Sequence, residues 1–159
     1  MTPSADPSTG PLADPAENTA RVPVYDQVTV GDELPPVEVW VRRGDLVRYA
    51  GASGDFNPIH WNSRAATELG LPDVIAHGMF TMGQAARVLT GWVVDPGRIV
   101  EFTVRFANPV VVPDQLDGVT VSYAGKVAEK LNDNRVRIEL TASCGESKVL
   151  GNARAIVRL

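Results

Sequence analysis

Residues 77–94 constrain the fold more than any other segment, because they are apolar on most sides of a helix. One stripe of this predicted helix carries Met79, Met82, Gly83, Ala86, Thr90 and Val93. Phe80 and Leu89 make much of the remaining surface apolar as well. A helix that is apolar on most sides is stable only when it is buried. The rest of the chain must therefore supply a layer that covers it.

Patterns typical of β-strands lie on both sides of this helix in the sequence. Residues 37–41 alternate as a strand does, after an expected break at Pro35-Pro36. Further strands are predicted over residues 100–106, 119–127, 136–144 and 149–159, with turns at 132–134 and 145–147. In the first of these, the apolar residues at 100, 102, 104 and 106 are expected to form a buried face.

Two short helices are predicted between the first strand and the long helix. The first has Asp45 in its first turn and stops in the glycine-containing residues 51–54. The second covers residues 63–69, with Ser63 as its cap and Gly70 after its end. Strands segregated from helices in this order indicate an α+β protein, with one antiparallel sheet wrapped around one long central helix.

Residues 1–22 differ from the rest of the 159-residue chain. Four prolines interrupt any helix there, and Leu12 is the only large aliphatic residue between Met1 and Val22. Such a segment buries too little apolar surface to offset its ordering entropy. The sequence therefore predicts a disordered N-terminal tail over residues 1–22 and one folded domain over residues 23–159.

Composition excludes several classes of protein. The 15 basic and 19 acidic residues give a net charge of −4, so no basic excess is available for a nucleic acid. One cysteine, Cys144, and two histidines are too few for an internal disulfide or a closed zinc site. The sequence contains no apolar run near the ~20 residues of a membrane span, and its N-terminus has no secretion-signal pattern. A soluble cytoplasmic protein is expected.

The candidate catalytic groups lie between residues 55 and 78. Asp55 and His60 are five positions apart, a spacing that only a curled, proline-containing loop makes convergent. A paired carboxylate and imidazole suit proton transfer near neutral pH. Asn57 is expected to hold the loop by hydrogen bonds from its side chain to the backbone. The structural alternative, with Asp55 as a cap and His60 as a half-buried surface residue, remains open on this motif alone.

Gly78 stands at the start of the long helix, where free backbone N–H groups collect. A substrate carbonyl could approach this backbone closely and gain stabilisation as it becomes an oxyanion. The alternative is a glycine required only for packing or capping. For the neighbouring His77 we favour a hydrogen-bonded loop histidine without a catalytic role.

Together these motifs resemble a known family. Asp55-Phe56-Asn57-Pro58-Ile59-His60, followed after sixteen residues by His77-Gly78-Met79, is similar to the motif of MaoC-like (R)-specific enoyl-thioester hydratases and 3-hydroxyacyl-thioester dehydratases. The likeness runs from about Val24 to Leu159. Its character is nearest to the β subunit of actinobacterial (3R)-hydroxyacyl-ACP dehydratases. The resemblance implies the hot-dog fold, which agrees with the order of elements predicted above.

The resemblance also implies a function. The substrate would be a trans-2-enoyl or (3R)-hydroxyacyl thioester of coenzyme A or acyl carrier protein, hydrated or dehydrated reversibly. Asp55 and His60 would hold the water or hydroxyl, and the Gly78 N–H would bind the thioester oxygen. No metal or cofactor is implied. A dimer is expected, either of two copies or with a sister hot-dog subunit.

Two other functions remain as alternatives. One is a thioesterase, because hot-dog folds carry both chemistries and a fold does not fix function. The other is a non-catalytic partner subunit of a dehydratase heterodimer, although such a subunit has no need for both Asp55 and His60. Acyl chain length, carrier and pathway do not follow from the sequence.

Overall fold

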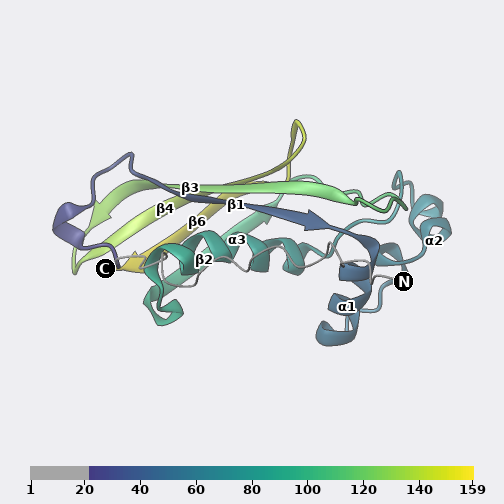
Figure 1. Cartoon of the computed structure of the whole chain (residues 1–159), viewed down its shortest axis with the longest axis horizontal. Coiled ribbons are helices and arrows are strands. Elements are labelled where there is room, and N and C mark those ends of the chain that lie inside the picture. Colours follow the sequence, from purple (N-terminus) through teal and green to yellow (C-terminus); the bar gives the residue numbers. More distant parts are fainter. Residues whose placement is uncertain (1–21) are drawn as a thin grey trace, which may run out of the picture.

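The computed structural model describes residues 22–159, in which an antiparallel sheet lies over one long helix (Figure 1). The predicted tail falls outside the described residues, apart from Val22. The helices are α1 (Arg43–Ser53), α2 (Ser63–Glu68) and α3 (Gly78–Val93), with short 3-10 turns η2 (Tyr25–Gln27), η3 (Pro58–His60) and η4 (Pro96–Arg98). The strands are β1 (Glu33–Val41), β2 (Ile99–Phe106), β3 (Val119–Leu131), β4 (Arg135–Cys144), β5 (Ser147–Lys148) and β6 (Leu150–Arg158).

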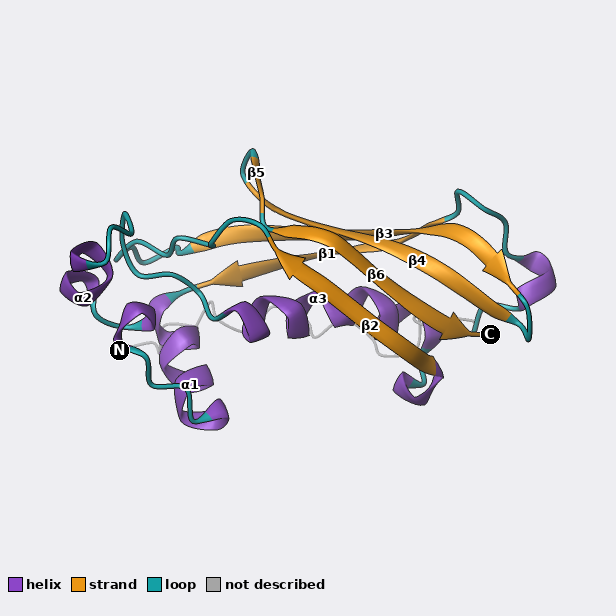
Figure 2. Ribbon diagram, turned by 180° about the vertical axis from the view of Figure 1, so that it is seen from behind, coloured by secondary structure: helices purple, strands orange, loops and turns teal. Residues whose placement is uncertain are grey.

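The sheet has the strand order β1-β3-β4-β6-β2, and the short β5 pairs with β4. All these pairs are antiparallel. The helix α3 runs along one face of the sheet, while α1 and α2 lie together beyond one end of it (Figure 2). The predicted α+β class and the long central helix are confirmed. No helix within residues 22–159 has the length and apolar character needed to cross a membrane.

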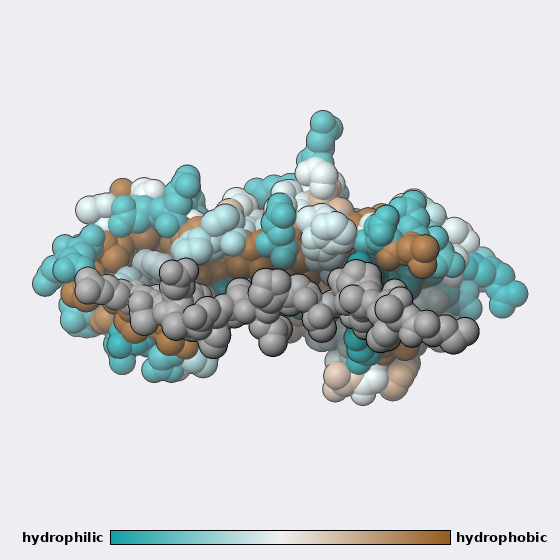
Figure 3. Space-filling model, viewed as in Figure 1, coloured by the Kyte–Doolittle hydropathy of each residue, from teal (hydrophilic) through white to brown (hydrophobic). Residues whose placement is uncertain are grey.

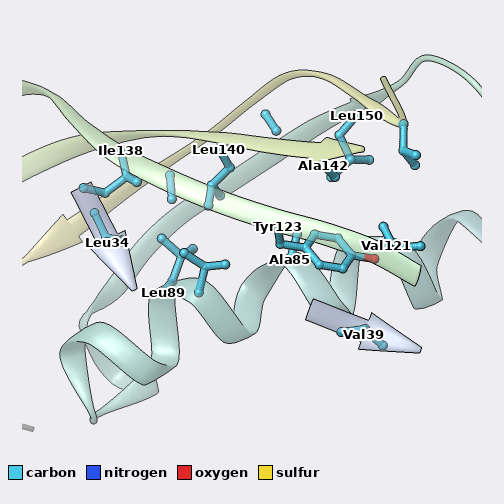
Figure 4. Packing of buried hydrophobic residues seen from close by; sticks show 14 of the residues in the cluster. Leu34, Val39, Ala85, Leu89, Val121, Tyr123, Ile138, Leu140, Ala142 and Leu150 are labelled. Atoms are coloured by element: carbon cyan, nitrogen blue, oxygen red, sulfur yellow. The ribbon is translucent and has the colours of Figure 1, made fainter. Parts of the chain in front are cut away.

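The core lies between α3 and the sheet. Leu89 and Ala85 of α3 face Tyr123 of β3 and Leu140 of β4 (Figure 4). The strands bury alternate residues here because successive side chains of a strand point to opposite faces. This packing fixes the position of α3, and with it the place where the helix begins.

The predicted stripe of α3 is not its buried side. The residues that the sheet covers are Thr81, Ala85, Val88, Leu89 and Val93. Of the predicted stripe only Val93 is buried, and Met79 and Gly83 are exposed. The helix is apolar around much of its circumference, so periodicity could not select the side that the sheet covers. In Figure 3, apolar residues form a band beneath the polar residues that lie along the upper rim of the molecule.

The predicted break at Pro35-Pro36 is wrong, because β1 begins at Glu33 and continues through both prolines. The pairing of β1 with β3 shifts register between Leu34 and Val37. Proline is tolerated at such an irregularity and in an edge strand, where its missing N–H removes no necessary ladder bond. Since β1 is one edge of the sheet, both conditions are met.

The predicted buried face of residues 100–106 is only half correct. Phe102 and Val104 are partly buried, but Val100 and Phe106 are exposed. The strand β2 forms the other edge of the sheet and has a neighbouring strand, β6, on one side only. The alternation is present, but Val100 and Phe106 at the two ends of the strand remain about half exposed.

The helix ends follow the predicted chemistry with one correction. Gly54 ends α1 in the left-handed conformation at φ 76°, as the glycine-containing stop predicts. The cap of α2 is Asn62 rather than Ser63, because the Asn62 side chain accepts the Ala65 N–H at 3.1 Å. The Ser63 hydroxyl instead accepts hydrogen bonds from the Arg43 guanidinium at 3.2 Å.

Replacing Tyr123 with phenylalanine is expected to raise the free energy of unfolding by about 1 kcal/mol. The Tyr123 side chain is buried and its hydroxyl has no hydrogen-bond partner among the described residues. Burial also raises the pKa of this hydroxyl well above its ordinary value. Urea denaturation of the two proteins measures the difference. A destabilised Phe variant would show that the hydroxyl makes a hydrogen bond in solution.

Candidate active site

Asp55 and His60 converge in the loop that follows α1. Gly54 turns the chain out of the helix, and Pro58 then begins the single turn η3 that contains His60. This curl brings Asp55 Oδ2 to 3.9 Å from His60 Nε2. The His60 side chain is only 9% exposed, whereas that of Asp55 is 51% exposed. The five-residue spacing therefore places a buried imidazole beside a carboxylate that water can reach.

A backbone carbonyl fixes the protonation pattern of the His60 ring. His60 Nδ1 lies 2.7 Å from the Ile75 carbonyl oxygen, which can only accept a hydrogen bond. Nδ1 must therefore carry a proton and donate it to this contact. In the neutral ring the lone pair then lies on Nε2, the atom that faces Asp55. His60 is thus oriented to accept a proton at Nε2 or, once charged, to return it.

Asn57 orders the loop in the way that the sequence predicts. Its side-chain oxygen accepts the Ile59 N–H at 3.3 Å and caps the turn η3. Its own N–H donates to Asp55 Oδ1 at 3.2 Å. The second carboxylate oxygen, Oδ2, remains directed at His60. Asn57 therefore acts on the shape of the loop and on the orientation of the carboxylate.

Gly78 is the first residue of α3, so its N–H has no acceptor inside the helix. A cavity of about 330 Å³ borders this point and the His60 ring. Phe106, from the end of β2, also lines it, and a Cβ at position 78 would lie 3.1 Å from the Phe106 ring. The cavity is therefore bounded by an imidazole, by the start of a helix and by an aromatic wall.

His77 lies against both Asp55 and His60, a position that the sequence did not predict. It is 1% exposed and stacks on His60, with ring centroids 3.7 Å apart and an angle of 23° between the planes. Its Nε2 lies 3.1 Å from the Asp55 carbonyl oxygen, while its Nδ1 has no partner among the described residues. Burial lowers the pKa of its imidazole. The expectation of a hydrogen-bonded loop histidine is thus only half correct.

Asp55, His60 and His77 together offer three atoms of metal-ligand type within 4.8 Å of one another. However, each imidazole already uses one nitrogen to contact a backbone carbonyl. The two rings are also stacked, so the remaining lone pairs lie in nearly parallel planes and do not converge on one point. The arrangement suits proton transfer better than the coordination of a metal ion.

Arg43 holds the segments around the site together. Its Nε donates to the Val112 carbonyl at 2.6 Å, and its Nη2 pairs with Asp73 at 2.8 Å. A hydrogen bond from the Val74 N–H, followed by those from Ser63 and Arg43, lowers the pKa of the Asp73 carboxyl. Asp73 precedes the segment that supplies the Ile75 carbonyl and His77. The contacts of Arg43 therefore join α1 to residues 73–77, the segment whose Ile75 carbonyl accepts the hydrogen bond from His60.

Comparisons with known proteins agree with this geometry. Residues 25–143 match the family model described as the MaoC like domain. The chain is 31% identical over 141 residues to the 3-hydroxybutyryl-CoA dehydratase of Methylorubrum extorquens, covering 87% of this chain and 85% of that protein. It is 46% identical over 83 residues to the 3-hydroxyacyl-thioester dehydratase X of Mycobacterium tuberculosis, covering 51% of this chain and 29% of that protein.

A solved structure described as a MaoC-like dehydratase superposes with a TM-score of 0.83 at 41% identity. The match covers 87% of this chain and 42% of that chain. The chain thus corresponds to less than half of this protein and of the Mycobacterium tuberculosis relative, but to most of the Methylorubrum extorquens enzyme.

Proposed function

This chain belongs to the MaoC-like dehydratase family, and on that premise we propose that it hydrates trans-2-enoyl thioesters and dehydrates (3R)-hydroxyacyl thioesters. One observation carries the proposal: the Asp55 carboxylate faces Nε2 of His60 across 3.9 Å, and His60 itself lines the cavity where α3 begins. The name of the Methylorubrum extorquens relative, which is similar over most of its length, supports the same chemistry.

The gap between Asp55 and His60 suits one water molecule. At 3.9 Å the two atoms are too far apart for a direct hydrogen bond, yet an oxygen to one side of them can reach both. Such a water donates one hydrogen to Asp55 Oδ2 and the other to His60 Nε2. Its lone pair then points away from both groups, toward C3 of an enoyl thioester.

The proton balance of the reaction uses the same two groups. On hydration, the water bonds to C3 and gives one proton to the Asp55–His60 pair, while C2 receives a proton from the pair. Dehydration reverses these transfers, removing the C2 proton and releasing the C3 hydroxyl as water. Because two interacting groups titrate as a unit, the roles of base and acid belong to the pair. The reaction moves protons only, so the proposal includes no cofactor.

Gly78 supplies the electrostatic part of the proposal. A thioester carbonyl in the cavity would accept a hydrogen bond from the Gly78 N–H at the positive end of the α3 dipole. Negative charge develops on this oxygen when the enolate forms, so the hydrogen bond strengthens in the transition state. The absence of a side chain at Gly78 keeps this backbone accessible beside Phe106.

An absorbance assay tests the proposal. Purified protein is mixed with crotonyl-CoA and longer trans-2-enoyl thioesters, and hydration appears as loss of the conjugated enoyl absorbance. A thiol reagent run in parallel detects hydrolysis. Loss of absorbance without release of thiol supports the hydratase. Release of thiol would indicate a thioesterase, and neither signal would indicate a non-catalytic partner subunit.

We also propose that the enzyme is cytoplasmic and works as a dimer, joined along an exposed edge of its sheet. Both β1 and β2 are edge strands, and β2 leaves Val100 and Phe106 exposed. Pairing with another strand would satisfy the free backbone groups of an edge.

Sedimentation is expected to give about twice the 17.1 kDa mass of the chain, alone or only after mixing with a sister hot-dog subunit. The first result indicates a homodimer and the second a heterodimer. A single-chain mass under both conditions would contradict the pairing.

A further inference from the structure

We propose that His77 is a positioning residue, which keeps the Asp55 carboxylate and the His60 imidazole separated by the width of one water molecule. The inference rests on the proposed function and adds to it a residue that touches both members of the pair. His77 itself contacts no substrate atom in this proposal. It acts through the two groups that do.

Two contacts of His77 set the relative position of the pair. Its ring stacks on the His60 ring at 3.7 Å, and its Nε2 contacts the backbone carbonyl of Asp55 at 3.1 Å. The His77 side chain thus contacts the ring of His60 and the backbone of Asp55. Because His77 directly precedes α3, these contacts connect the pair to a helix that packs in the hydrophobic core.

The hydrogen bond to Asp55 has no substitute in the loop. The other hydrogen bonds of Asp55 among the described residues join it to Ser53 and Asn57, each two positions away. Local bonds of this kind shape the turn but do not fix its distance from another element. The His77 contact spans 22 residues and is the bond that can hold the Asp55 backbone against the core.

The two imidazoles must carry their protons on opposite nitrogens. The Asp55 carbonyl can only accept, so His77 carries its proton on Nε2 and leaves Nδ1 without one. For His60 the same argument places the proton on Nδ1 and the lone pair on Nε2. The buried Nδ1 of His77 has no acceptor for a second proton among the described residues. His77 therefore remains a neutral donor.

Loss of the donor would let the carboxylate move. Asp55 is half exposed, so without its link to the core it can close onto His60 Nε2 or turn into solvent. Closure excludes the water and leaves two acceptors, the carboxylate and the lone pair of Nε2, facing each other. Turning outward removes one of the two acceptors of the water. Either movement affects the chemical step more than binding of the thioester, because the Gly78 N–H and the cavity remain.

Two substitutions separate the contacts of His77. His77→Phe keeps a flat ring for stacking but has no donor, whereas His77→Gln places an amide N–H near the position of Nε2 and loses the ring. We expect His77→Phe to lower kcat by about 30-fold with KM changed less than about threefold, and His77→Gln to recover at least about tenfold of this loss. Tyr123→Phe, a buried aromatic substitution elsewhere in the core, is the control and should leave kcat unchanged.

The tautomers of the two histidines can be tested by a measurement that does not depend on enzyme activity. The chain has two histidines, so long-range proton–nitrogen NMR spectra at alkaline pH resolve both rings. The proposal requires one neutral ring protonated at Nδ1 and the other at Nε2. Two rings of the same tautomer would overturn it, as would a folded His77→Phe variant with the kcat of the wild type, or one that changes only KM. Should the wild type show no hydration at all, the proposed function fails, while the spectra still decide the geometry of the pair.

Discussion

Replacing Asp55 with asparagine is expected to lower the hydration rate by at least about 10²-fold with the fold intact. The amide has the size of the carboxylate, and its oxygen can still accept the Asn57 N–H, which contacts Asp55 Oδ1 at 3.2 Å. It cannot take a proton from the water that faces His60. Enoyl absorbance at saturating substrate measures the turnover, and circular dichroism checks the fold.

The same loss of at least about 10²-fold is expected for substitutions of His60. His60→Ala removes the base, but it also leaves the Ile75 carbonyl without its donor. His60→Asn is therefore the sharper variant, because its amide N–H can replace Nδ1 in the hydrogen bond to Ile75 while nothing replaces Nε2. Glu68→Gln, at an exposed carboxylate of α2, is the matched control and should keep its activity. A near-normal rate in Asp55→Asn or His60→Asn would remove the pair from the mechanism.

Replacing Gly78 with alanine is expected to lower turnover by about 10-fold or more, while the free energy of unfolding changes by less than about 1 kcal/mol. The new Cβ would lie 3.1–3.2 Å from atoms of the Phe106 ring. Phe106 is exposed and can move, so the helix tolerates the methyl group. However, both the methyl group and the displaced ring occupy the space where the thioester oxygen must approach the Gly78 N–H. Steady-state kinetics and thermal denaturation measure the two effects.

Gly91→Ala is the matched control for this substitution. Gly91 lies in the same helix and is exposed, and outside the backbone of α3 itself no described atom lies within 4 Å of the place that its Cβ would take. Alanine there should stabilise the helix by up to about 1 kcal/mol and leave activity unchanged. If Gly78→Ala retained full activity, the helix start would not be the binding site of the carbonyl. Equal losses in both variants would instead indicate a general effect on α3.

Much of the fold could be predicted because its signals are local. Alternation indicated the strands, and Gly54 and the 132–134 turn gave the ends of elements, since Asp133 and Asn134 adopt positive φ as expected of a tight hairpin turn. The errors occur where two local signals compete. Pro35-Pro36 is typical of a break but lies in an edge strand, and Asn62 and Ser63 are both good caps, of which only Asn62 contacts the helix N–H groups.

The candidate site likewise has a part that local signals predict and a part that depends on contacts between distant residues. Asp55, Asn57 and His60 lie within six residues, so the chemistry of a proline-containing turn allowed the prediction that Asp55 and His60 converge while Asn57 holds the loop. His77 depends on contacts with residues 17 and 22 positions earlier in the chain, His60 and Asp55. No spacing rule connects them, and its role could not be separated from that of an ordinary buried histidine.

The sequence by itself determined the elements, their order and the loop that holds the carboxylate and the imidazole, because hydrophobic period, capping and turn formation act between residues a few positions apart. Only the tertiary structure decided which side of α3 the sheet covers, which nitrogen of each histidine carries the proton, and how far Asp55 stands from His60. These depend on contacts between segments distant in the chain, such as the Ile75 carbonyl with His60 and the Phe106 ring over Gly78. Packing brings such groups together, and local preference carries no information about them.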